Sequence, residues 1–302
     1  MRAALLSLLF ITVAAGQDLV REVRTAIAQN NFAAGEALIG KYKATAGTTP
    51  EMIEAVSWLG RGALAAKQFD RAQAYASETR KLVLEELKRR PLDAEPHLPN
   101  ALGASIEAQA QAMAARGERD QAVQFLRAEV KAWWSTSIRT RIQKNIHLLS
   151  LEGKPAPALD VSRWLGPKPP ALSQLHGKTV LLFFWAHWCA DCKRQAADVV
   201  RVASEYGPKG LVVIGPTRRY GYVAGGVEAP PEKETAYIES VRQEFYAALA
   251  RMPAPLSEEN FKNYGSSSSP TLVLVDRQGI VRMYHPGAMS YSELASAVQA
   301  AL

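Results

Sequence analysis

The chain contains two cysteines, Cys189 and Cys192, and both lie in one short motif. An apolar run at 179–186 precedes them, and the pattern of residues 193–205 after them predicts a helix. A strand-to-helix turn of this kind places cysteines beside the free backbone amides of a helix start, which stabilise a thiolate. The spacing and placement predict thiol-disulfide exchange, in which Cys189 attacks a partner disulfide and Cys192 resolves the mixed disulfide.

Three other roles for the cysteines are open at this point. Buried thiols serve as small apolar side chains in many proteins. A structural zinc site needs four ligands, and the only further ligand near the pair is His187. A copper carrier is the third alternative, with Cys189, Cys192 and His285 as ligands.

Three segments of the chain resemble the thioredoxin superfamily, and most closely its extracytoplasmic TlpA- and ResA-like thiol-disulfide oxidoreductases. They are Gly-Lys-Pro-Ala-Pro at 153–157, the run at 177–192 that ends in Trp-Ala-His-Trp-Cys-Ala-Asp-Cys, and Ser-Pro-Thr-Leu-Val-Leu-Val-Asp at 269–276. The resemblance implies a redox-active disulfide between Cys189 and Cys192, with no other cofactor. It also implies a cis bond between Ser269 and Pro270, in a loop against the cysteines where substrate backbone would bind.

The pattern of short strands and helices after residue 170 predicts the same fold without the motif. Strands are expected at 180–186, 211–214, 272–275 and 280–284, and helices at 193–205, 234–251 and 292–302. Residues 276–279 are typical of a hairpin turn between the last two strands. Because the strands are continuously apolar, we expect a central sheet flanked by helices, an α/β thioredoxin-like domain over 152–302.

Asp191 stands where relatives in this superfamily often carry proline. Its negative charge disfavours a thiolate at Cys189, so we expect a more reducing pair. Lys193 and Arg194 offset part of this effect, although charges on an exposed helix face are screened. An acidic residue in the first turn also suits a helix on structural grounds alone.

Relatives often carry a buried acid near the pair, either six residues before the first cysteine or three after the second. Phe183 and Gln195 occupy these positions here, and neither side chain acts as an acid or a base. His187 is the nearest titratable substitute, because imidazole titrates close to neutral pH. A purely structural histidine is the alternative. We expect Trp188 to form an apolar rim beside Cys189.

A glycine-rich, aromatic loop follows the strand expected at 211–214. It lies in an insertion around 217–233 and carries four side chains suited to a partner surface, namely Arg218, Arg219, Tyr220 and Tyr222. The carboxyl ends of parallel strands share one edge of a sheet, so we expect this loop to emerge beside the cysteines and to bind the partner. A decorative loop without a binding role is the alternative.

Residues 17–151 are rich in Ala, Glu, Gln, Arg and Leu without a period-2 pattern, so we expect a helical domain. A turn followed by a small residue in a second helix recurs at 30–35, 67–72 and 117–122. The middle unit resembles the tetratricopeptide repeat, with Gly60 and Ala72 as its small residues. The irregular spacing leaves a helical bundle as the alternative to a degenerate tetratricopeptide-like domain.

Residues 1–16 have the features of a secretory signal peptide. Arg2 supplies the positive charge, residues 3–13 form an apolar core, and small residues follow. We expect export to the periplasm or another extracytoplasmic compartment, without stable membrane insertion after cleavage. The formal net charge is +7, but the basic residues are interspersed and form no stripe suited to nucleic acid.

Together these features predict an exported thiol-disulfide oxidoreductase that reduces protein disulfides. Its electron donor is unidentified, and the helical domain is expected to bind the partner protein. A scaffold whose thioredoxin-like domain only docks is an alternative from another class. A peroxiredoxin-type peroxidase is a further alternative, but it needs a threonine three residues before its reactive cysteine, where this chain has Ala186.

Overall fold

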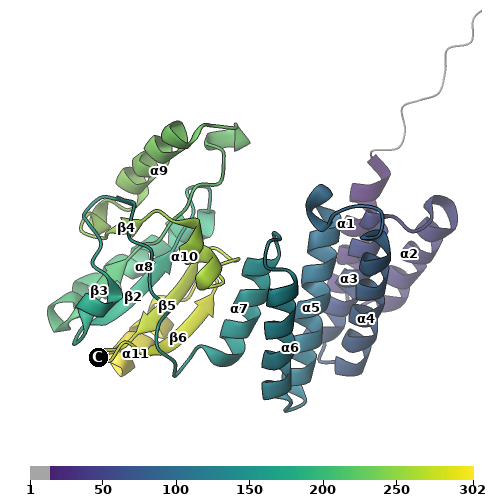
Figure 1. Ribbon diagram of the computed structural model, residues 1–302, viewed down its shortest axis with the longest axis horizontal. Coiled ribbons are helices and arrows are strands. Elements are labelled where there is room, and N and C mark those ends of the chain that lie inside the picture. Colours follow the sequence, from purple (N-terminus) through teal and green to yellow (C-terminus); the bar gives the residue numbers. More distant parts are fainter. Residues whose placement is uncertain (1–13) are drawn as a thin grey trace, which may run out of the picture. The chain divides into compact units, whose positions relative to one another are not determined.

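The computed structural model describes residues 14–302 (Figure 1). It divides into two units, a helical one that ends at Ile138 and a mixed one, Arg139–Leu302. The expected signal peptide, residues 1–16, lies outside the described residues except for its last three positions. In the described part of the chain, no helix combines the length and the apolar character needed to cross a membrane.

Helices of the first unit form consecutive pairs. They are α1 (Ala14–Ala28) with α2 (Phe32–Ala46), α3 (Pro50–Ala65) with α4 (Phe69–Glu86), and α5 (His97–Ala115) with α6 (Arg119–Ala132). Helix α1 packs on α3 and α3 packs on α5, so the first helix of each pair contacts the first helix of the next. A short 3₁₀ helix, η1 (Leu92–Ala94), lies between the second and third pairs.

The turn within each pair occurs where the recurring sequence pattern predicted it. Asn30, Lys67 and Gly117 adopt left-handed backbone angles, with φ of 55°, 58° and 89°, and the next helix begins two residues later in each case. The small residue after the first turn allows close packing, since a Cβ on Gly35 would lie 3.0 Å from Cδ2 of Leu59 on α3. The expectation of a helical N-terminal region is confirmed.

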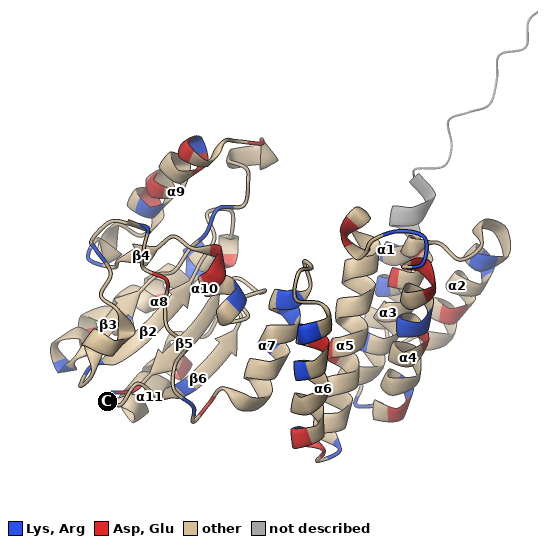
Figure 2. Cartoon of the chain, viewed as in Figure 1, with Lys and Arg blue, Asp and Glu red and all other residues tan. Residues whose placement is uncertain are grey.

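Charged residues of both signs are distributed over both units (Figure 2). Some form ion pairs between neighbouring helices, such as Arg80 on α4 with Glu129 on α6 at 2.8 Å. The charge of the described residues is therefore interspersed, as the sequence indicates, which suits a solvated surface better than a nucleic-acid-binding face.

The second unit is built on a four-stranded sheet with the order β3-β2-β5-β6. Its strands are β2 (Thr179–Phe184), β3 (Leu211–Ile214), β5 (Thr271–Val275) and β6 (Val281–Pro286). Strand β3 runs parallel to β2, whereas β5 runs antiparallel to both β2 and β6. The turn between β5 and β6 contains Gly279 with φ of 82°, so the predicted hairpin is confirmed.

Helices flank this sheet and complete a thioredoxin-like fold, which confirms the predicted fold class. They are α7 (Arg139–Ser150), α8 (Ala190–Tyr206), α9 (Pro231–Phe245), α10 (Glu258–Asn263) and α11 (Tyr291–Ala301). Two features were not expected from the sequence, α10 and a small sheet of β1 (Trp164–Leu165) with β4 (Ala254–Pro255). The helix expected at 234–251 begins at Pro231 and ends at Phe245, and a short 3₁₀ helix, η5 (Ala247–Leu249), follows it before β4.

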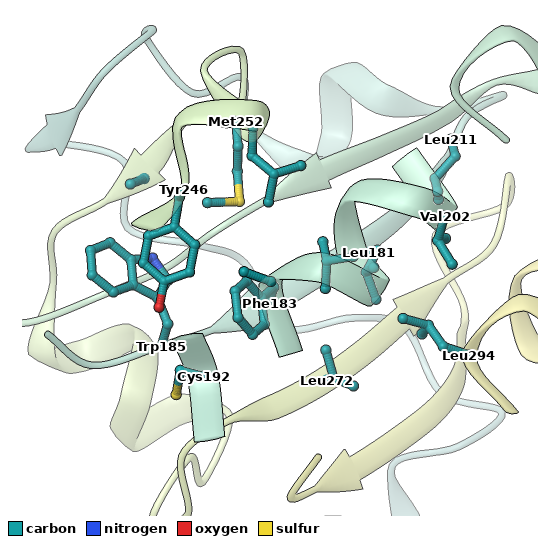
Figure 3. Close-up of a cluster of buried hydrophobic side chains, with 14 of the residues drawn as sticks. Leu181, Phe183, Trp185, Cys192, Val202, Leu211, Tyr246, Met252, Leu272 and Leu294 are labelled. Atoms are coloured by element: carbon teal, nitrogen blue, oxygen red, sulfur yellow. The ribbon is translucent and has the colours of Figure 1, made fainter. Parts of the chain in front are cut away.

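Every residue of β2 is buried. Because successive residues of a strand point to opposite faces, both faces of the sheet are covered. On one face, Leu181 and Phe183 of β2 join a cluster with side chains of α8, α9 and α11 (Figure 3). On the other face, Leu182 and Phe184 pack with Phe261 of α10. Burial of a large apolar side chain contributes about 1.5–3 kcal/mol, so packing from both sides holds the carboxyl end of β2 in place.

Helix α7 belongs to the second unit, so the division lies at 138/139 rather than at the predicted boundary near 151. Nε2 of His147 lies 2.8 Å from the carbonyl oxygen of Asn263, at the end of α10. Burial lowers the pKa of His147, and the Asn263 carbonyl acts in the opposite direction. A Cβ on Gly265 would lie 2.3 Å from the backbone nitrogen of Lys144, so α7 packs directly on the chain here. The proline-rich segment therefore begins one helix after the boundary between the two units.

We expect Gly265→Ala to destabilise the second unit by about 2–5 kcal/mol, of which about 1–2 comes from a left-handed backbone and about 1–3 from overpacking against α7. The φ of Gly265 is 59°. Gly153→Ala is the matched control, because Gly153 has a φ of 79° and open space around it. Urea unfolding followed by tryptophan fluorescence measures the difference, and equal losses in both variants would contradict the close approach of α7.

Candidate active site

The two cysteines lie at the start of α8, where they form a disulfide. Cys189 is the N-cap residue, and its sulfur accepts a hydrogen bond from the backbone N–H of Cys192 at 3.1 Å. The same sulfur lies 3.4 Å from the carbonyl oxygen of Ser269. Cys189 is 3% exposed and Cys192 is 0% exposed. Cys189, the cysteine predicted to attack, is therefore the more exposed of the two.

Ser269 and Pro270 form the cis peptide bond that the resemblance implies. The bond directly precedes β5, which is hydrogen-bonded to β2, and the loop therefore lies at the end of β2 where the cysteine motif begins. Oγ1 of Thr271 donates a hydrogen bond to the carbonyl oxygen of Ser268 at 2.7 Å, which closes the loop. The structure thus brings this loop against Cys189, as expected.

The two tryptophans of the motif have different environments. Trp185 is buried, and its Nε1 donates a hydrogen bond to the carbonyl oxygen of Gly215 at 2.9 Å. Trp188 is 49% exposed and lies next to Cys189 in the chain, where an apolar rim was expected. Cys192 belongs to the same apolar cluster as Trp185 and lies near it (Figure 3). Cys189 belongs to this cluster too, but its sulfur accepts a hydrogen bond from a helix amide, which makes Cys189 the better placed nucleophile.

The loop after β3 lies directly beside the cysteine motif. Oγ1 of Thr217 donates a hydrogen bond to the carbonyl oxygen of Trp185 at 3.0 Å. The ring of Tyr220 meets the ring of Trp188 edge to face, with centroids 5.5 Å apart. The guanidinium of Arg218 stacks over Tyr220 at 4.5 Å. The expected location of the loop is confirmed, and its role in partner binding stays a prediction.

The rest of the loop is a small hairpin. Tyr222 and Glu228 form an antiparallel bridge, and the turn between them contains Gly225 and Gly226 with φ of 68° and 75°. A shallow hollow of about 630 Å³ is lined by residues of this hairpin. Arg219 is partly exposed just before it. The insertion therefore has a defined backbone with a surface that a partner can contact.

Asp191 lies in the first turn of α8 and forms an ion pair with Arg194. Both side chains are more than half exposed. Lys193 instead stacks over the ring of Phe245, 4.0 Å from its centroid. Of the two cations expected to offset the charge of Asp191, Arg194 is the one in contact with it.

His187 is buried, with 1% exposure, in a polar and aromatic surrounding. Its Nε2 lies 3.4 Å from Oε1 of Glu234, which is also 1% exposed. The rings of Tyr220, Tyr222 and Tyr237 surround the imidazole at centroid distances of 5.5, 5.4 and 5.3 Å. Burial lowers the pKa of His187, and the charge of Glu234 acts in the opposite direction. Glu234 was not expected from the sequence, because no pattern links the first turn of α9 to the cysteine motif.

The two positions where relatives carry an acid hold core side chains. Phe183 packs in the cluster that also contains Cys192. Oε1 of Gln195 accepts a hydrogen bond from the backbone N–H of Met289 at 2.7 Å, which ties α8 to the segment after β6. Neither residue exchanges a proton with the cysteines.

The ligands of the copper alternative are not brought together. Within residues 14–302, no group of three or more His, Cys, Asp or Glu side chains is arranged to hold a metal ion. Nε2 of His285 lies 3.2 Å from the carbonyl oxygen of Ala288. The structure therefore gives no support to a copper site made of Cys189, Cys192 and His285.

Comparison with known proteins agrees with this geometry. Residues 153–218, which contain both cysteines, match the AhpC/TSA family. The chain is similar to the thioredoxin-like protein YneN of Bacillus subtilis, with 26% identity over 144 residues that make up 47% of this chain and 76% of YneN. It is also 30% identical over 142 residues to protein DipZ of Mycobacterium bovis, a match that covers 44% of this chain and 18% of DipZ.

Solved structures of thioredoxin-like proteins also resemble the chain. A thiol:disulfide interchange protein of the thioredoxin family from Chlorobium tepidum has a TM-score of 0.39 and 18% identity, covering 49% of this chain and 96% of that one. Ala186, buried just after β2, stands at the position where the peroxiredoxin-type alternative needs a threonine. The second unit therefore has a thioredoxin-like fold, and its segment with both cysteines is similar to the AhpC/TSA family.

Proposed function

We propose that the chain is an exported thiol-disulfide oxidoreductase that reduces disulfides of protein partners through Cys189 and Cys192. The observation that carries this proposal is the position of the Cys189 sulfur. It caps the start of α8, 3.1 Å from the backbone nitrogen of Cys192, and lies 3.4 Å from the carbonyl oxygen of Ser269. A sulfur placed between helix amides and an extended loop suits attack on a disulfide in a bound peptide.

The reaction transfers two electrons in two displacement steps. The Cys189 thiolate attacks one sulfur of the partner disulfide, forms a mixed disulfide and releases the other partner sulfur as a thiolate that takes up a proton. Cys192 then loses its proton and attacks Cys189, which forms the Cys189-Cys192 disulfide and releases the reduced partner. A separate thiol donor must reduce the pair before the next cycle.

Three surfaces around Cys189 are proposed to receive the partner chain. They are the loop with Ser269 and Pro270, the exposed ring of Trp188, and the insertion with Arg218, Arg219, Tyr220 and Tyr222. The aromatic and arginine side chains are of the types that interfaces favour. The loop lies beside the motif, which supports this assignment.

The direction of electron flow is proposed to depend on charge at the start of α8. Asp191 places a negative charge in the turn that carries Cys189, and this charge disfavours the thiolate of the reduced form. A less stable reduced form makes the pair a better reductant. The ion pair with Arg194 weakens the effect without removing it, because both side chains are exposed and screened.

The helical unit is proposed to be a tetratricopeptide-like domain that binds the partner protein. Its helix pairs and the packing of α1, α3 and α5 on one another support this reading. Export is proposed from the charged, apolar and small-residue segments at 1–16. An extracytoplasmic location would bring the domain to proteins that contain disulfides.

We expect Cys192→Ser to accumulate mixed disulfides with partner proteins in cells. The variant keeps the attacking sulfur but lacks the one that releases the partner. Non-reducing electrophoresis followed by mass spectrometry of species that dissolve on reduction measures this. Cys189→Ser is the matched control and should trap few partners. Equal trapping by both variants would refute the roles of the two sulfurs, and no trapping by either would refute exchange with proteins.

We expect Asp191→Asn to raise the reduction potential by about 5–20 mV, the size of an interaction between exposed charges. Removing the charge stabilises the thiolate, and hence the reduced form. Arg194→Ala should shift the potential in the opposite direction, because it leaves Asp191 without its ion-pair partner. Equilibration with glutathione buffers measures both shifts, and shifts of the same sign would contradict the electrostatic explanation.

A further inference from the structure

Glu234 holds the loop after β3 by its backbone. This residue lies in the first turn of α9, and its carboxylate is buried. One oxygen accepts the backbone N–H of Tyr220, and the other accepts the backbone N–H of Gly221 at 2.9 Å. A buried carboxylate is stable only when its oxygens are paired, so the loop and the charge depend on each other.

The same carboxylate contacts the cysteine motif. Oε1 of Glu234 lies 3.4 Å from Nε2 of His187, two residues before Cys189. Both ring nitrogens of His187 are buried and have no hydrogen-bond partner among the described residues, so the contact with Glu234 is one of charge and proximity. One side chain of α9 therefore connects the insertion with the turn that carries the attacking sulfur.

The aromatic rings around His187 extend this connection to the rest of the site. Tyr220 contacts both His187 and Trp188. Burial raises the pKa of Tyr220, whereas hydrogen bonding to Arg218 and Ser269 acts in the opposite direction. Tyr220, which is part of the loop, therefore interacts with both the cysteine motif and the segment that contains the cis-proline.

The net charge of the buried His187 and Glu234 side chains depends on whether the imidazole is protonated. Titratable side chains face His187 from every element packed on it: Glu234 and Tyr237 from α9, Tyr220 and Tyr222 from the loop, and Lys193 from α8. Burial and the charge of Lys193 lower the pKa of His187, and Glu234 opposes both. With neutral His187 the Glu234 carboxylate is held by the two loop amides alone, whereas protonated His187 adds an opposite charge 3.4 Å from it.

We propose that Glu234 is a positioning residue of the redox site, which holds His187 and the loop against the Cys189 turn, and that protonation of His187 in this pair stabilises the Cys189 thiolate. The proposal rests on the proposed function, because it assigns the control of that same sulfur. The proton comes from solvent and enters no bond with sulfur. The thiolate population of Cys189 then changes in two steps with pH, one for the thiol itself and one for His187.

The test measures the sulfur and the imidazole separately, in the Cys192→Ser background. Alkylation of Cys189 by iodoacetamide is followed from about pH 4 to about pH 10, a range that spans the titration of imidazole and of a thiol. The His187 midpoint is followed by NMR of the ring protons. Glu234→Gln removes the charge and keeps the side-chain shape. His187→Phe removes the proton site and keeps an aromatic ring. Glu239→Gln is the control on α9, since Glu239 bonds Arg242 instead.

We expect two steps in the parent alkylation profile and one step in His187→Phe. Glu234→Gln should move the His187 midpoint down by about 0.5 pH unit or more, because it removes the charge that favours imidazolium. Glu239→Gln should leave both readouts unchanged. A purely structural role would alter stability in these variants but would not move the histidine step.

Two results would overturn the proposal. One is an alkylation profile of His187→Phe that superimposes on that of the parent, and the other is an unchanged His187 midpoint in Glu234→Gln. If Glu234→Gln does not fold, His187→Phe alone decides, since it keeps the aromatic packing. Turnover of the unmodified chain on insulin disulfides is measured in parallel. Its absence would refute the proposed function, while a shifted alkylation profile would still support the pairing of Glu234 with His187.

Discussion

The site depends on one constraint, the parallel pairing of β2 with β3. Because the two strands run in the same direction, the segments that follow them leave the sheet at the same edge. The cysteine motif follows β2 and the aromatic loop follows β3, so the pairing places them side by side. Strand β5 runs the opposite way, and its start brings Ser269 and Pro270 to that edge. Three connections far apart in the sequence therefore meet at Cys189.

Packing on both faces of the sheet makes this meeting point rigid enough for chemistry. Leu181 and Phe183 are buried on one face, and Leu182 and Phe184 on the other, so β2 cannot shift register without exposing large apolar side chains. The end of β2 is therefore held in one position, and so is Cys189, the N-cap residue of α8. The disulfide chemistry requires this precision, because a displaced sulfur would not face both the helix amides and the Ser269 carbonyl.

Local patterns in the sequence predicted the elements whose packing is local. The turns at Asn30, Lys67 and Gly117, the hairpin at Gly279 and the helix start at the cysteines all follow from neighbouring residues. What the sequence does not reveal depends on contacts between distant segments. Helix α7 joins the second unit through the close approach of Gly265. Likewise, Glu234 meets His187 only because the loop returns along the cysteine motif, a path that no periodicity encodes.

The position of Glu234 also matters because this chain lacks a buried acidic residue at either of the two positions near the cysteines where the resemblance leads one to expect it. Phe183 and Gln195 fill the two usual places, and both are committed to packing or to a backbone hydrogen bond. A buried carboxylate is nevertheless present, supplied by a helix that the insertion precedes and oriented by the backbone of the loop itself. Burial of a charge is costly unless it is paired. The backbone amides of Tyr220 and Gly221 pair with the Glu234 carboxylate, so the backbone of the loop and this buried charge stabilise each other.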